Sequence, residues 1–194
     1  MKRMRTLVYL LHHGATDATR ARSGSTPAPC EDPALAPAGV RQAEATRNFL
    51  AIRPIDHCYC SPLRSALQTA VIVAAPHGLT PKPLEALAEC DLGHSGGLDA
   101  LSIGRRDSDS FDALCGRMAE VMETIISQHP GQAVLVVGHH LANRAYLANV
   151  MGLSAAQVRH MRLDTCGISV IVRYGAETTV STVNATFHLQ GVAA

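Results

Sequence analysis

Two pairs of adjacent histidines are the residues of this chain best suited to carry out chemistry. The first pair, His12 and His13, comes directly after the apolar segment 6–11, and the second pair, His139 and His140, follows a similar segment. Near neutral pH an imidazole can act as a nucleophile, a general acid or base, or a metal ligand. Both pairs are therefore candidates for one functional site.

The segments before the two pairs explain why they are expected to meet. A short β-branched apolar run that ends in Gly and polar residues is typical of a buried strand that opens into a loop. In open α/β sheets, ligands bind in the crevice beyond the carboxyl ends of the strands. The sequence thus predicts that both histidine pairs face that crevice.

Strand and helix patterns alternate along the chain. Strands are predicted at 5–11, 55–60, 80–84, 133–138, 166–173 and 178–185. Helices are predicted at 38–51, 62–75, 111–128 and 141–151, with Ser61 as the N-cap of the second. This order predicts one domain over residues 1–194: an α/β fold, a three-layer α/β/α sandwich with a mostly parallel central sheet and helices on both faces.

The helix predicted after Ser61 adds two features of an anion site. The free backbone N–H groups at the start of a helix favour negative charge. Arg64, one turn into this helix, can present a planar pair of donors to the same anion.

Composition excludes several classes of partner. With 17 Lys and Arg against 16 Asp and Glu, the chain carries a net charge of +1, which argues against nucleic acid and membrane surfaces as partners. No apolar stretch approaches the roughly 20 residues of a membrane span. The six cysteines show no paired CxxC spacing, so a reduced, cytoplasmic protein is expected. Cys58 and Cys60 alternate in a predicted strand and should be buried on the same face.

Five motifs, in order along the chain, resemble the histidine phosphatase superfamily, the phosphoglycerate mutase-like proteins. They are His12-His-Gly-Ala-Thr16, Leu35-Ala-Pro-Ala-Gly-Val-Arg-Gln-Ala43, Ser61-Pro-Leu-Arg-Ser-Ala-Leu-Gln-Thr-Ala70, Leu87-Ala-Glu-Cys-Asp-Leu-Gly93 and Val137-Gly-His139. The Ser-Pro-Leu-Arg block, Ser61 to Arg64, is the most specific of the five.

The resemblance implies a role for each matching residue. His13 is the expected nucleophile, His139 stabilises charge on the transferring group, and Glu89 protonates the leaving oxygen. The expected phosphate-binding residues are His12, Arg64, Thr19 and His140. Phosphoryl transfer depends mainly on positioning and on positive groups around spreading negative charge, which suits these residue types.

His12 departs from the family pattern, which has Arg immediately before the nucleophilic His. An imidazole loses its charge above a pKa of about 6.5, and a missing charge-assisted hydrogen bond is worth about ten- to hundredfold in phosphate affinity. His140, which stands where the family usually has Gly, is a candidate replacement donor. If His12 must be charged, activity should favour mildly acidic pH. The segment between Gly97 and Phe111 is shorter than the family's usual lid, which predicts an open pocket.

The resemblance implies a phosphomonoester hydrolase of the histidine acid phosphatase type, acting through a phosphohistidine on His13 without a metal or other cofactor. Its expected partner is a small phosphorylated substrate or inorganic phosphate. An open pocket makes a mutase less favoured, because a mutase must exclude water. The edge strand near Leu84 and the C-terminal strands are candidate homodimer interfaces.

Three alternatives remain open. A non-catalytic homologue would bind phosphoesters or a protein partner. The four histidines together with Glu89 offer nitrogen and oxygen ligands for zinc or iron. Gly93-His-Ser95-Gly-Gly97 fits the nucleophile elbow of α/β-hydrolases, with Asp164 and His188 in the right chain order. The remaining histidines are expected to be ordinary loop or surface residues: His57, His77, His94, His129, His160 and His188.

Overall fold

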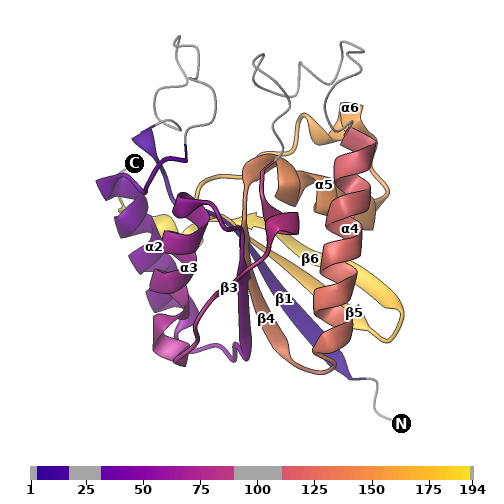
Figure 1. Cartoon of the computed structure of the whole chain (residues 1–194), viewed down its shortest axis with the longest axis horizontal. Coiled ribbons are helices and arrows are strands. Elements are labelled where there is room, and N and C mark those ends of the chain that lie inside the picture. Colours follow the sequence, from indigo (N-terminus) through magenta and orange to yellow (C-terminus); the bar gives the residue numbers. More distant parts are fainter. Residues whose placement is uncertain (1–3, 18–31, 90–110, 193–194) are drawn as a thin grey trace.

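The computed structural model describes residues 4–17, 32–89 and 111–192 (Figure 1). The strands are β1 (Arg5–His12), β2 (His57–Cys60), β3 (Lys82–Pro83), β4 (Ala133–Gly138), β5 (Ile168–Tyr174) and β6 (Glu177–Ala185). The helices are α2 (Pro37–Leu50), α3 (Arg64–Ala74), α4 (Phe111–Gln128), α5 (His140–Met151) and the single turn α6 (Ala155–Val158). Short 3₁₀ turns are η1 (Ala75–His77), η2 (Glu85–Leu87) and η4 (Phe187–Leu189).

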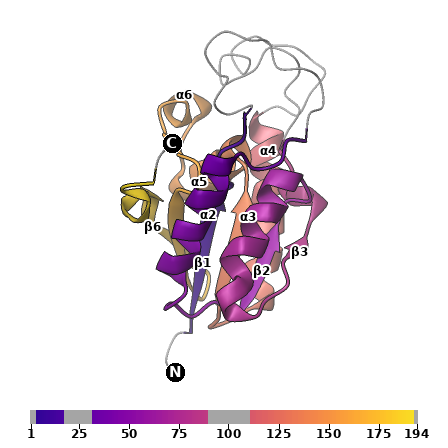
Figure 2. The ribbon, with the colours of Figure 1, turned by 90° about the vertical axis from the view of Figure 1, so that its left-hand side faces the viewer.

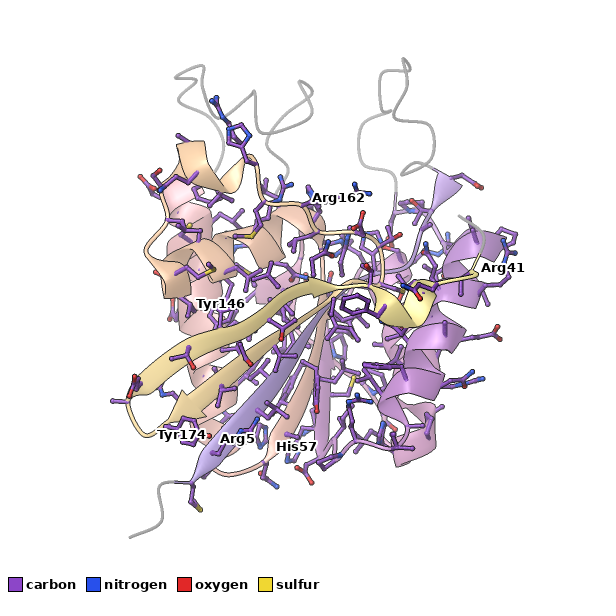
Figure 3. The ribbon with its side chains drawn as sticks, turned by 180° about the vertical axis from the view of Figure 1, so that it is seen from behind. Arg5, Arg41, His57, Tyr146, Arg162 and Tyr174 are labelled. Carbon is purple, nitrogen blue, oxygen red and sulfur yellow. The ribbon has the colours of Figure 1, made fainter. Side chains whose placement is uncertain are left out.

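The six strands form one sheet in the order β3-β2-β4-β1-β5-β6. The pairs β3–β2, β2–β4 and β4–β1 are parallel, whereas β5 is antiparallel to β1 and β6 is antiparallel to β5. In Figure 3, Arg5 and His57 at the starts of β1 and β2 lie at the same end of the sheet as Tyr174, the last residue of β5. The prediction of an α/β fold is confirmed, and the C-terminal hairpin makes its sheet a mixed one.

Helices cover both faces of the sheet, as predicted. Figures 1 and 2 show α2 and α3 on one face and α4 and α5 on the other. Alternation along β1 supplies both cores: Val8 and Leu10 pack with α4 and α5, whereas Tyr9 and Leu11 pack with α2 and α3. The central strands are thus fixed from both sides, and their carboxyl ends form a rigid edge.

The short edge strand β3 shows why the sheet stops there. Pro83 belongs to the strand and Pro81 precedes it, and a proline has no N–H to donate to a further strand. Pro37 is the first residue of α2, a position that suits proline because the first N–H of a helix has no partner within the helix.

Two predictions about local structure are wrong. Helix α3 begins at Arg64 rather than after Ser61, because Leu63 remains extended and occupies the N-cap position. The Ser61 hydroxyl accepts a hydrogen bond from the backbone N–H of Leu63 at 3.2 Å. His129 is not a surface residue: it is 8% exposed, stacks on His57 with 3.7 Å between ring centroids, and lies 2.8 Å from the Tyr59 hydroxyl.

The cysteines and helices agree with the expectations where the structure describes them. Cys58 and Cys60 are buried in the same core, and burial raises the pKa of Cys60 to about 11. They and two further described cysteines, Cys115 and Cys166, are free thiols. Within the described ranges, no helix has both the length and the apolar character that a membrane crossing requires.

Candidate active site

The two histidine pairs meet because β1 and β4 are neighbouring parallel strands. His12 is in register with Gly138, and the backbone N–H of His13 donates to the Gly138 carbonyl at 3.1 Å. The residue after Gly138 is His139, so the carboxyl ends of the two strands present their imidazoles at the same edge of the sheet. The convergence predicted from the sequence is present.

The four imidazoles form a connected cluster. The ring centroids of His12 and His13 are 4.6 Å apart, and those of His13 and His139 are 5.0 Å apart. His140, the first residue of α5, is half-buried, and its ring centroid lies 5.5 Å from that of His12. His13 is therefore flanked by two imidazoles, as a nucleophile surrounded by charge-stabilising groups would be.

The protonation of His13 is set by its own loop. Its Nδ1 atom lies 2.8 Å from the carbonyl oxygen of Gly14. A carbonyl only accepts hydrogen bonds, so Nδ1 carries the proton and Nε2 holds a lone pair. Burial lowers the pKa of His13 below 6.5, which keeps the ring neutral near pH 7. This is the form that can attack an electrophile.

The loop that follows His13 is held tightly against α2 and α3. The backbone N–H of Gly14 donates to Oγ1 of Thr69 at 3.0 Å, and that of Ala15 donates to Oε1 of Gln42 at 2.9 Å. A Cβ atom on Gly39 would lie 2.0 Å from the carbonyl oxygen of Ala15, so only glycine allows this approach. The loop therefore has little freedom to move the His13 ring.

His12 is held by the segment before β5. Its Nδ1 atom donates to the Asp164 carbonyl oxygen at 3.1 Å. The backbone N–H of Cys166, a residue with a φ of 55°, donates to the carbonyls of both His12 and His13, at 3.0 and 3.1 Å. Burial, followed by the neighbouring imidazoles, holds the pKa of His12 well below 6.5. The expected preference for mildly acidic pH assumed that His12 is charged. The structure does not support that assumption.

His139 has a partner that the sequence analysis assigned elsewhere. Its Nε2 atom lies 2.7 Å from the Oγ atom of Ser61, which follows β2. Oγ accepts a hydrogen bond from Leu63, so its own proton is available to donate to Nε2. Burial lowers the pKa of His139 to about 3. Ser61 follows β2, which pairs with β4, so the ends of these two strands bring Ser61 and His139 together. The interpretation of Ser61 as a helix cap obscured this.

Glu89 lies at the start of α5, beside the histidine cluster. Its two carboxylate oxygens accept hydrogen bonds from the backbone N–H groups of Leu141 and Ala142, at 3.3 and 3.2 Å. Arg117 of α4 donates through Nη1 to the carbonyls of Ala86 and Ala88, both at 3.0 Å. Those bonds fix the segment that carries Glu89.

The remaining predicted phosphate ligands are placed less completely. Arg64, the first residue of α3, is exposed, and its backbone N–H donates to the Asp32 carboxylate at 2.7 Å. Thr19 lies outside the described residues. Arg144, which the sequence analysis did not single out, is 7% exposed and stands four residues after His140, on the same face of α5.

A comparison with known protein families identifies this arrangement. A model of the histidine phosphatase superfamily (branch 1) matches residues 8–186. The chain belongs to this superfamily. Its relatives include the probable phosphoglycerate mutase GpmB of Yersinia pestis (strain Pestoides F), which is 29% identical over 182 residues, covering 84% of this chain and 82% of the relative.

Solved structures share the fold of this superfamily member. The phosphoserine phosphatase of Entamoeba histolytica, in complex with 3-phosphoglyceric acid, superposes with a TM-score of 0.82 at 19% identity, over 95% of this chain and 99% of the other. YhfR of Bacillus stearothermophilus gives 0.84 at 20% identity, with the same coverage. A mycobacterial glucosyl-3-phosphoglycerate phosphatase gives 0.76 at 22% identity, over 94% and 100%. The phosphoglycerate mutase-like fold is thereby confirmed.

The rival sites gain no support from the described residues of this chain. Among them, no three His, Cys, Asp or Glu side chains are arranged to hold a metal ion. The elbow around Ser95 lies outside the described residues. Its proposed partners are engaged elsewhere: Asp164 with Arg162 and Asn184, and His188 with Thr46 and the Cys166 carbonyl.

Proposed function

We propose that this chain is a phosphomonoester hydrolase that works through a phosphohistidine on His13. The observation that carries the proposal is the hydrogen bond from Nδ1 of His13 to the Gly14 carbonyl, 2.8 Å long, in a ring flanked by His12 and His139. It leaves the Nε2 lone pair free to attack phosphorus. Membership in a superfamily whose solved structures include phosphatases supports this choice.

The reaction has two steps that share one set of residues. In the first, Nε2 of His13 bonds to phosphorus as the ester P–O bond breaks, and Glu89 gives a proton to the leaving oxygen. In the second, water attacks phosphorus, the N–P bond breaks, and Glu89 takes the water's proton. We assign the stabilisation of the spreading charge on the phosphoryl oxygens to His139, His140 and Arg64, and contact with the same group to His12. Neither step uses a metal or other cofactor.

The test is a phosphatase screen on wild type, His13→Ala and His12→Arg, combined with quenching in alkaline detergent to trap a phosphorylated protein. We expect wild type to hydrolyse small phosphate monoesters in the presence of EDTA and to carry an acid-labile phosphate. His13→Ala should lose both properties. A purified wild-type chain that binds phosphate without turnover would instead show a non-catalytic homologue.

A mutase is the second candidate, because the Yersinia relative is a probable phosphoglycerate mutase. Both activities share the first step, and they differ in whether water or a second hydroxyl accepts the phosphoryl group. Supplying 3-phosphoglycerate and measuring 2-phosphoglycerate against free phosphate separates the two. Hydrolysis is expected to dominate.

A further inference from the structure

His12 presents a hydrogen-bond acceptor to the site. Its Nδ1 atom donates to the Asp164 carbonyl, so in the neutral ring Nε2 holds a lone pair. Within the part of the chain that the structure describes, the hydrogen bond of the His12 side chain is made by Nδ1, and the residue is 6% exposed. The Nε2 lone pair can therefore accept a hydrogen bond from a ligand that donates a proton.

The Asp164 carbonyl that orients His12 is itself fixed. The Asp164 carboxylate accepts hydrogen bonds from Nε of Arg162 at 2.7 Å and from Nδ2 of Asn184 at 2.9 Å. Its backbone N–H donates to Oδ1 of Asn184 at 2.8 Å. Three bonds thus hold the residue, and the Gly167 N–H, which donates to its carbonyl oxygen at 2.9 Å, also fixes that oxygen. Turning the His12 ring over would therefore lose the hydrogen bond from Nδ1. The acceptor character of Nε2 is built into the fold.

The titratable groups around His12 disfavour a charge on it. Strand β1 contributes His13, and the start of α5 contributes His139 and His140, all of which act to lower the pKa of His12. The one group that raises it is the Asp164 carbonyl. Two carboxylates lie on the neighbouring segments: Glu89 at the start of α5 and Asp164 before β5.

Building on the proposed function, we infer that the site takes the phosphoryl group in its singly protonated form, with the P–OH donating to Nε2 of His12. The ligand class is then a phosphate monoester monoanion or its inorganic counterpart. A phosphodiester and a sulfate ester have no such proton near neutral pH, so neither can make this bond. His12 is in this sense a specificity-determining residue.

The location of the shared proton decides between phosphate and sulfate. A phosphate monoester has a second pKa of about 6, so the ligand keeps the proton more readily than the buried His12 ring takes it. Sulfate is a far weaker base, and its binding would require a protonated His12 among three other imidazoles. Phosphate should therefore be strongly preferred.

The test measures binding of inorganic phosphate and sulfate by calorimetry across the pH range in which phosphate titrates. For wild type we expect phosphate to bind at least about tenfold more tightly than sulfate near pH 6. Above the second pKa of phosphate, its affinity should fall about tenfold for each pH unit, the slope of a one-proton requirement. His12→Arg should bring sulfate to within about threefold of phosphate and flatten this slope, because Arg donates at every pH. His160→Arg makes the same substitution at an exposed histidine, and it should leave the preference for phosphate and the pH slope unchanged.

A spectroscopic measurement on wild type keeps the inference testable if His12→Arg fails to fold. The ³¹P chemical shift of bound phosphate should remain that of the monoanion up to about pH 8. A bound dianion shift, or equal affinities for the two anions with hydrolysis intact, would overturn the inference and leave the proposed function standing. Failure to bind either anion at millimolar concentration would overturn both.

Discussion

Ser61 and His139 are joined by a 2.7 Å hydrogen bond between the ends of two neighbouring strands. The serine is fully buried and the histidine 4% exposed, so water competes little for this bond. The hydroxyl therefore fixes the orientation of the His139 ring, whose centroid lies 5.0 Å from that of His13.

Ser61→Ala should therefore weaken phosphate binding and turnover by about three- to tenfold, since a buried hydrogen bond contributes about 1 kcal/mol. Steady-state kinetics with phosphate as a product inhibitor would measure both quantities. Ser65→Ala, at a buried serine in the first turn of α3, is the matched control and should leave both constants unchanged. Equal effects of the two substitutions would contradict the positioning role of Ser61.

The histidine cluster should make the fold sensitive to acid. His139 has a pKa of about 3 in the folded protein against 6.5 for an ordinary histidine, and burial is the main cause. The unfolded chain therefore binds protons as pH falls below about 6.5, and the folded chain does not. The free energy of unfolding should decrease by about 1.5–2 kcal/mol from this residue between about pH 6.5 and pH 5. Urea denaturation at both pH values measures it.

His139→Asn should reduce that dependence on pH, whereas His160→Asn, at an exposed histidine, should retain it. His12 and His13 add to the same trend, because burial also lowers their pKa values. Stability that is constant from pH 7 to about pH 5 would show that these rings are protonated in the folded protein.

Two glycine substitutions should change the stability of the protein in opposite directions. A Cβ on Gly39 meets the Ala15 carbonyl oxygen at 2.0 Å, so Gly39→Ala must displace the loop that orients His13. We expect a loss of about 2–3 kcal/mol in stability and a large loss of turnover. Gly116 lies exposed in α4, and a Cβ atom added there would meet nothing within 4 Å, so Gly116→Ala should stabilise the protein by about 0.5–1 kcal/mol. Thermal denaturation and kinetics of both variants check the pair.

Arg117 should act on turnover through Glu89. Methionine has no N–H to donate to the Ala86 and Ala88 carbonyls, so Arg117→Met should let the segment before Glu89 shift. We expect kcat to fall about tenfold, while phosphate binding changes less than about twofold. Arg159→Met, at an exposed arginine, is the control. A parallel loss of kcat and phosphate affinity would indicate a general structural defect.

Much of the fold was predictable because its elements carry strong local signals. β1, α4 and β4 follow from uninterrupted apolar runs or from clear helical spacing, and their predicted bounds differ from the observed ones by one residue at most. The turn α6 was missed although Ser154 and Gln157 form the capping box that begins it. Its four residues are too few to show periodicity.

Site residues that directly follow a strand could be predicted from the sequence. Residues whose role depends on a contact between distant parts of the chain could not. His13 and His139 follow from the ends of β1 and β4. The role of the Asp164 carbonyl was not readable, because it depends on a contact across 152 residues of chain. His129 was misjudged for the same reason, since its burial arises from Tyr59, 70 residues earlier.

The double hydrogen bond from the Cys166 N–H to the carbonyls of His12 and His13 bears on how the protein is made. Synthesis begins at the amino end, so both imidazoles emerge from the ribosome long before the residues that orient them. A nascent chain that ends before β5 can form the parallel strands but still lacks the residues that hydrogen-bond to His12 and His13. Competence for catalysis should therefore appear late and abruptly during translation, once the final hairpin has joined the sheet.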